Sequence, residues 1–320
     1  MTEFVPERRD RKLDQAAHAA WLYYIAENTQ EEIAAKLNVS RQAAQRLVAL
    51  AVSEKLIKFR LDYPLSECIA LAESLRDRFG LSLCEVVPNS LGSGETFNGI
   101  SVCAATHLEA YLVAKTPTIL AFSTGRTLRT TIEQIPSMHQ PQHKIVSILG
   151  NMSQDGRAGR HEIVVRLSEQ VDAQAYLVPM PVVAKSAEER NLLQKQRSFV
   201  TVKALSAQAK ATFVGISPIS WNAPLHQHGF IDDEELAELI ELKAVGEIAG
   251  WAYDQQGVLI QGGTNSRVTS IPLEQPPLRL TIGVAGGTKK AEAILAALHG
   301  KLINGLITDE SAAQAILAKL

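Results

Sequence analysis

Residues 28–51 read NTQEEIAAKLNVSRQAAQRLVALA and predict two short amphipathic helices that are broken at Asn38. Thr29 is expected to cap the first helix, and Glu32, three residues later, completes a capping box. Ser40 is a favoured N-cap for the second helix. Two short helices joined by a tight turn are typical of a helix-turn-helix, whose second helix enters the major groove of DNA.

The polar face of the second helix carries guanidinium and amide groups, which pair well with base edges and phosphates. The expected buried positions of the two helices are Ile33, Ala34, Leu37, Ala43, Ala44, Leu47, Val48 and Ala51. The small Ala34 allows the two helices to cross closely. The predicted DNA-binding residues are Thr29, Ser40, Arg41, Gln42, Gln45 and Arg46.

Local charge separates this interpretation from a purely structural helix pair whose polar face only meets solvent. Residues 36–60 hold six basic side chains and one acidic side chain, Glu54, so their net charge is +5 in a chain whose formal net charge is -2. Contact with phosphates by counterion release requires such a cationic patch. The sequence therefore favours binding of a double-stranded DNA operator.

Length and composition are those of an ordinary globular protein of about two domains, with 320 residues of which 46% are hydrophobic. The N-terminus MTEFVPERRDRKLD is polar, and no apolar run approaches the roughly 18 residues of a membrane span, so we expect a cytoplasmic protein. Three cysteines without C-x-x-C spacing suggest neither a disulfide framework nor a zinc site. We expect Cys68, Cys84 and Cys103 to be reduced and mostly buried, and we expect no cofactor.

The segments around the helix pair suggest the domain organisation. Residues 14–26 predict a first helix that packs Trp21, Leu22 and Ile25 on the pair, and residues 53–61 look like a short strand or wing. A further amphipathic helix is expected over residues 66–79, ending at Gly80. The predicted organisation is a winged-helix-like helix-turn-helix domain over 1–62, a linker helix over 63–80 and an effector-binding domain over 81–320.

Beyond residue 80, strand-like runs alternate with helical stretches. The expected strands are LCEVVP from residue 83, TPTILAFS from 116, HKIVSILG from 143, QAYLVPMP from 174, ATFVGIS from 211 and LRLTIGVAG from 278. Long helices are expected over residues 95–114 and 126–134. Such alternation predicts a Rossmann-like α/β domain with a mainly parallel sheet covered on both faces, which binds ligands at the carboxyl ends of its strands.

Four glycine-containing loops follow predicted strands: residues 123–127, 150–151, 215–217 and 283–290. Each alone is equally well explained as a tight connection, but together they suggest a cleft for a small polyhydroxylated or phosphorylated compound. The last is not a Walker A loop, because the spacing differs and Ala291 follows Lys290. The predicted effector-binding residues are Ser123, Gly125, Arg126, Thr127, Asn151, Gly215, Ser217, Glu247, Gly286, Gly287 and Lys290.

These motifs resemble those of the sugar-binding bacterial transcription regulators of the SorC type, over nearly the whole chain. The matching segments are TQEEIAAKLNVSR, STGRTL, VGEIAG and GVAGGTKKAEAILAALHGKLINGLITDESAAQAIL. The resemblance implies an effector domain similar to sugar-phosphate isomerases and deaminases, joined to a DNA reader in a homodimer or homotetramer. It also implies cleft positions for residues 125–127, Glu247, Gly286, Gly287 and Lys290.

Ala121 and Ser123 stand where the family commonly has glycine, which weakens the expectation that this loop binds a phosphate. An unphosphorylated polyol therefore remains an alternative effector to a sugar or sugar phosphate. STGRTL and the segment from Trp21 look most like regulators of erythritol or related polyol catabolism. The resemblance further implies repression that the effector relieves.

An enzyme of the isomerase or deaminase type is the main alternative. Its candidate acid-base residues are Glu247, Asp254, His226 and Asp309, but no adjacent pairing and no catalytic motif is evident, so we expect no enzyme activity. The spacing of His226 and His228 suggests either a metal ligand pair or, more simply, a polar loop. A purely structural interaction protein would explain neither the cationic helix nor the glycine loops.

Overall fold

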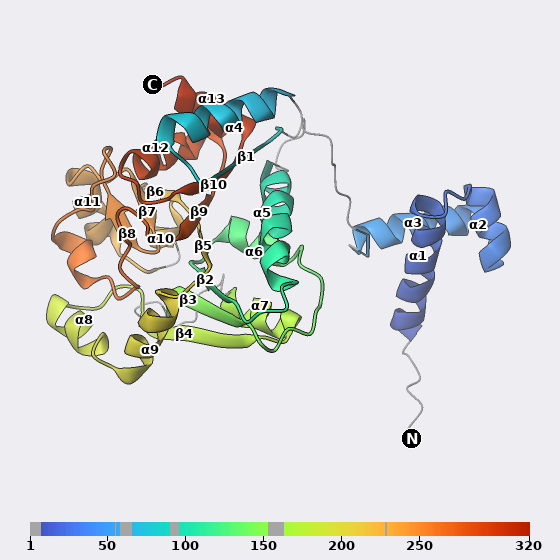
Figure 1. Ribbon diagram of the computed structural model, residues 1–320, viewed down its shortest axis with the longest axis horizontal. Coiled ribbons are helices and arrows are strands. Elements are labelled where there is room, and N and C mark those ends of the chain that lie inside the picture. The colour runs from blue at the N-terminus through green and yellow to red at the C-terminus, as the bar shows by residue number, and fades with distance from the viewer. Residues whose placement is uncertain (1–7, 55, 58–65, 90–95, 153–162, 228) are drawn as a thin grey trace. The chain divides into compact units, whose positions relative to one another are not determined.

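The computed structural model describes residues 8–54, 56–57, 66–89, 96–152, 163–227 and 229–320 (Figure 1). The chain forms two compact units, Met1–Pro64 and Leu65–Leu320. Within the described residues, none of the helices combines the length and the apolar character that a membrane span requires.

The smaller unit consists of helices α1 (Arg8–Tyr24), α2 (Gln30–Leu37) and α3 (Arg41–Ser53). The predicted capping box forms: the Thr29 hydroxyl accepts from the Glu32 amide at 3.3 Å, and the Glu32 carboxylate accepts from the Thr29 amide at 2.8 Å. The Ser40 hydroxyl accepts from the amide of Ala43 at 3.2 Å and starts α3. The turn between α2 and α3 passes through the left-handed Asn38.

The core of this unit differs from the prediction on α1. Its buried residues are Ala16, Ala19, Ala20, Leu22, Ile33, Ala34, Ala44, Leu47, Val48 and Ala51. Trp21 and Ile25, expected in this core, are 54% and 67% exposed. The reason is helical geometry, since alanines spaced three and four residues apart form the face that packs on α3 and leave Trp21 and Ile25 on the opposite side. The wing expected over residues 53–61 falls largely outside the described residues.

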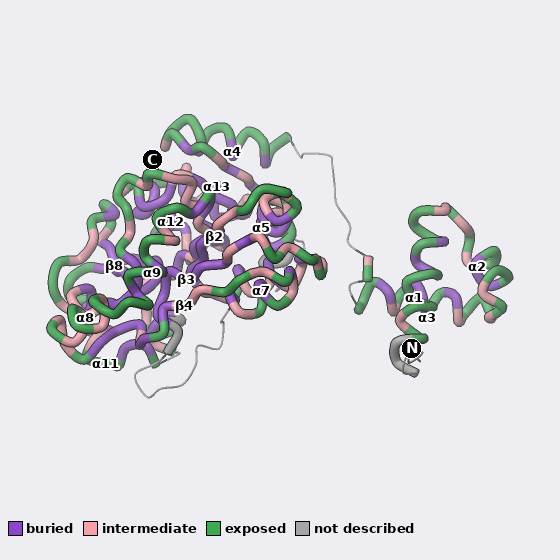
Figure 2. The backbone as a smooth tube through the Cα atoms, turned by 60° about the horizontal axis from the view of Figure 1, so that its bottom comes forward, coloured by how far each residue is buried: buried purple, intermediate pink, exposed green. Residues whose placement is uncertain are grey.

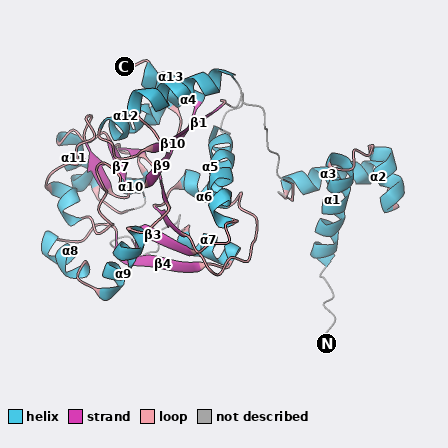
Figure 3. Cartoon of the chain, viewed as in Figure 1, coloured by secondary structure: helices cyan, strands magenta, loops and turns pink. Residues whose placement is uncertain are grey.

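The larger unit is built on a seven-stranded sheet, in which all neighbouring strands are parallel (Figure 3). Its strands, in spatial order, are β1 (Leu83–Val87), β10 (Gly305–Asp309), β9 (Leu280–Val284), β5 (Ala211–Val214), β2 (Ile119–Phe122), β3 (Lys144–Met152) and β4 (Gln174–Pro181). This confirms the predicted α/β class. Buried β-branched and aromatic residues make these central strands hydrophobic on both faces, as parallel sheets require.

Helices cover the sheet on two faces and create two separate cores. One core joins sheet residues such as Phe122, Phe213 and Ile307 to α5 (Thr96–Leu112), α6 (Arg126–Ile132) and α7 (Val164–Val171). The other core joins the opposite face to α4 (Ser66–Phe79), α9 (Arg197–Ser206), α12 (Ala291–His299) and α13 (Glu310–Leu317). Figure 2 shows buried strands beneath helices whose outer surfaces are exposed.

Helix α4 is the element that was expected to link the domains. It packs against β1 and α13. Its buried residues Cys68, Ala72 and Leu75 belong to the core on that face of the sheet. The helix is therefore an integral part of the larger unit.

A second, antiparallel sheet lies beside the main one and was not predicted. It consists of β6 (Ser217–Pro218), β7 (Gly246–Ile248) and β8 (Trp251–Tyr253). Strands of two or three residues are too short to show a periodic pattern. The short helices α8 (Ala187–Leu193), α10 (Pro224–Gln227) and α11 (Asp233–Glu241) complete this region.

Candidate functional site

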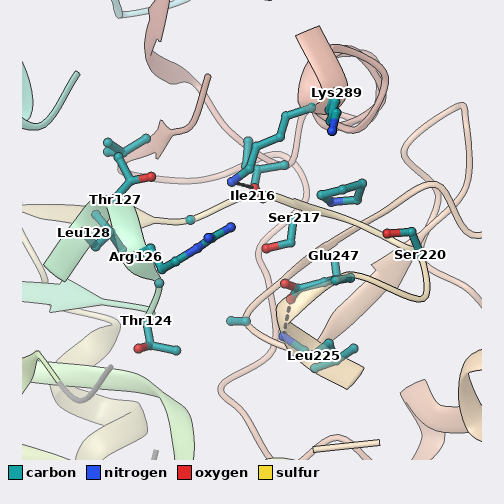
Figure 4. A pocket seen from close by; sticks show the side chains of 18 of the residues that line it. Thr124, Arg126, Thr127, Leu128, Ile216, Ser217, Ser220, Leu225, Glu247 and Lys289 are labelled. Atoms are coloured by element: carbon teal, nitrogen blue, oxygen red, sulfur yellow. Dashed lines mark hydrogen bonds between the residues drawn. The ribbon is translucent and has the colours of Figure 1, made fainter. Parts of the chain in front are cut away.

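The carboxyl ends of β2, β5 and β9 meet at a cavity of about 500 Å³. The loops that follow these three strands form one wall. The opposite wall comes from β7, the Ala249-Gly250 turn and the segment from Ser217 to Phe230. This is the position at which open parallel sheets bind ligands. Figure 4 shows Arg126 and Glu247 extending into this cleft from different elements.

The fold brings nine of the eleven predicted effector residues to the cleft. They are Gly125, Arg126, Thr127, Gly215, Ser217, Glu247, Gly286, Gly287 and Lys290. These residues come from four separate segments of the chain. The parallel strand order brings the loops after β2, β5 and β9 together, and the antiparallel pairing of β6 with β7 places Glu247 beside Ser217.

The two other predicted effector residues take different positions. Ser123 is buried behind the lining, where its hydroxyl accepts from the Gly215 amide at 2.9 Å and ties two cleft loops together. The Gly150-Asn151 loop is corrected to strand, because β3 continues to Met152. Gly150 allows this continuation, since a Cβ there would meet the backbone of Met180 and Pro181 at 2.8 Å. The side chain of Asn151 lies outside what the structure describes.

Glu247 provides a buried carboxylate at the wall of the cleft. It accepts a hydrogen bond from the Gly250 amide at 2.9 Å. Burial raises its pKa above the usual value, although the Gly250 amide, the Ser217 hydroxyl and the charge of Lys290 act in the opposite direction. The carboxylate is thus held in place with capacity to accept from ligand hydroxyls.

Lys290 provides the complementary cation. Its ammonium donates to the carbonyl oxygen of Ile216 at 2.8 Å, which fixes the side chain along the cleft wall. Burial lowers its pKa to about 8; the nearby Glu247 raises it, and Arg126 lowers it further. The cleft therefore combines an acceptor with two cationic donors at close quarters.

The Gly286-Gly287 loop is shaped by a buried carboxylate behind it. Asp309 accepts from the Gly287 amide at 2.7 Å and from the Ala312 amide at 2.7 Å, so it joins the loop to the start of α13. A Cβ on Gly286 would collide with Ile100 and Asp309, and Gly287 adopts a φ of 88°. Both glycines are therefore required by local geometry.

Most of the candidate acid-base residues of an enzyme are engaged in structural contacts. Asp309 braces the cleft loop, as described above. His226 pairs with Asp233 at 2.7 Å, and Asp254 accepts from the amides of Gln256 and Val258 at 2.9 Å. Glu247 alone among the four candidates lines the cleft. His228, the possible second metal ligand, lies outside the described residues.

Sequence reasoning missed the apolar part of the lining. Leu149, Val182, Ala223, Leu225 and Phe230 reach the cleft from segments without a glycine loop. They carry no distinctive motif, because an isolated apolar residue in a loop looks the same whether it lines a ligand site or a core. Thr124, Ser220 and Asn222 add polar groups to the lining of the cleft.

The predicted DNA-binding residues lie on α2–α3 of the smaller unit. Arg41, Gln42, Gln45 and Arg46 are all exposed on α3, whereas Leu47 and Val48 face the core. Arg41 lies 3.4 Å from Glu31, but both side chains are about two-thirds or more exposed, and such pairs contribute little. These four exposed side chains offer the hydrogen-bond donors that are needed to contact the bases and phosphates of a DNA duplex.

A family model described as "Putative sugar-binding domain" matches residues 63–318. The erythritol catabolism regulatory protein of Brucella abortus (strain 2308) is 30% identical over 304 residues, which cover 95% of this chain and 96% of that protein. The deoxyribonucleoside regulator of Bacillus subtilis (strain 168) is 28% identical over 321 residues, which cover 97% of this chain and 100% of that protein.

The fold is also similar to a solved full-length structure. The sorbitol operon regulator of Klebsiella pneumoniae superposes with a TM-score of 0.73 at 24% sequence identity, covering 98% of this chain and 100% of that chain. At this level of identity the likeness shows a common fold.

Proposed function

The chain belongs to the SorC-type family of sugar-binding transcription regulators, and from this premise we propose that it is a repressor whose operator affinity is set by a sugar, polyol or sugar phosphate in the cleft. It is a transcription regulator, as its relatives are. The relatives are named as a regulator of erythritol catabolism, a deoxyribonucleoside regulator and a sorbitol operon regulator, which leaves the enzyme alternative without support.

The observation that carries the effector assignment is the arrangement of Glu247, Arg126 and Lys290 around one cleft. A buried carboxylate selects ligand hydroxyl donors, and two cations select hydroxyl, carboxylate or phosphate oxygens. A compound with several hydroxyls and a volume below about 500 Å³ satisfies both sets. Erythritol-like polyols and short sugar phosphates meet this description.

On the DNA side, α3 of the smaller unit would occupy the major groove, with Arg41, Gln42, Gln45 and Arg46 at base edges and phosphates. Thr29 and Ser40 would contribute at the helix starts that approach the DNA backbone. We propose a homodimer or homotetramer, because a two-fold assembly places two such helices on a palindromic operator. The protein would act in the cytoplasm, where bacterial DNA lies.

The effector must discriminate between two states of the regulator. Binding in the cleft changes operator affinity only when the compound has different affinity for the DNA-competent and DNA-incompetent arrangements. We place the DNA-binding domain at residues 1–62 and the effector site within 81–320, with α4 between them in sequence.

Fluorescence anisotropy tests this proposal directly. A labelled DNA fragment from upstream of the protein's own operon is titrated with protein in the presence of erythritol, other polyols and sugar phosphates. We expect tight binding that one compound weakens. Absence of DNA binding at moderate salt would contradict the regulator assignment, and binding that ignores every compound would contradict the cleft assignment.

A further inference from the structure

Three metal-ligating side chains lie together at an edge of the larger sheet, away from the cleft. Glu85 belongs to β1, and Cys103 and His107 belong to α5, which packs on β1. One ligand atom from each lies within 4.8 Å of the others. This is the one such trio among the residues that the structure describes.

The local structure explains how the trio forms. Cys103 and His107 are four residues apart, so they occupy the same face of α5 one helical turn apart. Glu85 points to the face of β1 that also carries Leu83 and Val87, and both of these pack with Cys103 in the same core. A carboxylate among apolar neighbours is thereby directed at an imidazole and a thiol.

The spacing fits a tetrahedral cation. With metal–ligand bonds of about 2.0–2.3 Å, the ligand atoms of a tetrahedral zinc site lie roughly 3.3–3.7 Å apart. His107 Nε2 and Glu85 Oε1 are already 3.2 Å apart. For Cys103 Sγ to reach bonding distance of the same ion, it must move by about 1 Å, and a change in the cysteine side-chain torsion angle provides this movement.

We propose that Glu85, Cys103 and His107 form a zinc site in which the fourth coordination position is open to solvent. Sulfur, nitrogen and oxygen together match the borderline-soft character of Zn²⁺, whereas Mg²⁺ and Ca²⁺ prefer oxygen alone. All three residues are only partly buried, so an ion and a water can enter. As the Zn–S bond forms, the S–H bond of Cys103 breaks and its proton passes to solvent. The proton that His107 Nε2 donates to Glu85 must also leave this nitrogen before it can bind the ion.

A simpler explanation accounts for two of the three residues. Glu85 Oε1 and His107 Nε2 lie 3.2 Å apart, and the pKa of Glu85 is lowered first by its side-chain hydrogen bond to His107. Under this explanation Cys103 is only a small core side chain that packs with Leu83 and Val87. The two explanations differ in one measurable respect, which is whether Cys103 matters for metal binding.

Helix α5 connects the proposed site to the cleft, because it carries Cys103 and His107 and also contacts loops that line the cleft. Ser101 lies on the same helix, six residues before His107, and its hydroxyl donates to the carbonyl oxygen of Thr127 at 3.3 Å. Ile100 on the same helix is the side chain that a Cβ on Gly286 would strike. An ion that fixes α5 on β1 thus acts on the helix that contacts two cleft loops.

The test uses the full-length chain, stripped of metal with EDTA and then titrated with ZnCl2 against a fluorescent zinc indicator. We expect one equivalent of zinc to bind and Cys103→Ala to weaken binding by at least about tenfold. Cys68→Ala is the matched control, because it removes a buried thiol on α4 and should leave zinc affinity unchanged.

Cobalt substitution supplies a second, spectroscopic readout. Co²⁺ bound by the unmodified protein should show a thiolate-to-metal charge-transfer band in the near ultraviolet, and His107→Gln should diminish it. The proposal is overturned when the unmodified protein binds no zinc at a zinc concentration equal to the protein concentration. It is equally overturned when Cys103→Ala retains full affinity or when cobalt gives no thiolate band.

Discussion

Glu247 is a buried carboxylate at the wall of the cleft, and burial is the main influence on its pKa. Glu247→Gln keeps the size of the side chain and an oxygen that can accept from the Gly250 amide. What it removes is a charged acceptor for ligand hydroxyls. Charge-assisted hydrogen bonds contribute about 1.5–3 kcal/mol, so the effector concentration for half-maximal release of DNA should rise at least about tenfold.

The matched control for Glu247→Gln is Asp233→Asn, which neutralises a carboxylate on α11 that does not line the cleft. Operator binding without effector should be the same in both variants. Removing a carboxylate that is costly to bury should leave the thermal midpoint of Glu247→Gln unchanged or higher. An unchanged effector response would rule out Glu247 as a ligand contact.

Lys290 makes effector binding depend on pH in a defined direction. Its pKa is lowered to about 8, chiefly by burial, so the ammonium loses its proton as the pH rises through that value. An anionic effector should therefore bind more weakly at about pH 9 than at about pH 7, by up to roughly tenfold. Lys290→Met should bind more weakly at neutral pH and give a flat profile, as measured by calorimetry at both pH values.

The same titration separates the two effector classes left open by the sequence. A sugar phosphate interacts with the charge of Lys290, whereas a neutral polyol meets it only as a hydrogen-bond donor to one hydroxyl. Erythritol affinity should therefore vary much less between the two pH values. A phosphorylated effector whose affinity stays constant across this range would show that Lys290 does not contact the phosphate.

At the scale of elements, the exposure of α3 follows the prediction except at Ala43, which is half-buried instead of buried. Its four predicted polar residues are exposed, and its exposure pattern follows from the 3.6-residue period and the Ser40 cap. Arg41 lies at the first position of this helix. Its ion pair with Glu31 is exposed and weak, so the guanidinium is available to DNA at little cost.

Arg41→Ala should weaken operator binding by about tenfold, with a smaller salt dependence, while the smaller unit stays folded. Anisotropy at two salt concentrations gives both quantities. Arg78→Ala on α4 is the charge-matched control, since Arg78 is also exposed but belongs to the larger unit. If both variants bound the operator with equal affinity, Arg41 would not be part of the DNA interface.

How much of each element could be predicted depended on its length. Six of the seven strands of the main sheet were predicted, because burial of both sheet faces gives them β-branched runs, and this pattern identified the sheet and its ligand-binding edge. The remaining strand, β10, was missed. Strands β6, β7 and β8 hold only two or three residues and escaped notice, although β7 carries Glu247. On α1, Trp21 was predicted in the core because it is hydrophobic, but it lies away from the helix face that Ala16, Ala19 and Ala20 form.

The candidate site was predictable where glycine marks a strand end and unpredictable where side chains converge through the fold. Gly125, Gly215 and Gly286 identified three cleft loops. Gly125 has a positive φ of 149°, whereas Gly215 and Gly286 lie so close to neighbouring atoms that a Cβ would be crowded. Phe230 and Leu225 had no such signal. Cys103 and His107 have helical spacing, but their meeting with Glu85 depends on the packing of α5 on β1, which no local pattern reveals.

For the whole molecule, the place of α4 decides how the chain can be divided. Its buried residues Cys68, Ala72 and Leu75 pack into the core shared with β1 and α13. Removing the helix would uncover this apolar face, and burying side chains of this size contributes roughly 1–3 kcal/mol each. The compact unit accordingly begins at residue 65, ahead of the helix.

Two fragments test this division. The fragment 65–320 should fold cooperatively and bind the effector with the affinity of the full chain, but it should not bind the operator because α3 is missing. The fragment 81–320 should melt at least about 5 °C lower or aggregate, since it lacks α4. Near-ultraviolet circular dichroism and calorimetry measure both properties. Equal stability of the fragments would make α4 a dispensable linker, and the effector would then have to reach the DNA-binding unit through some other element.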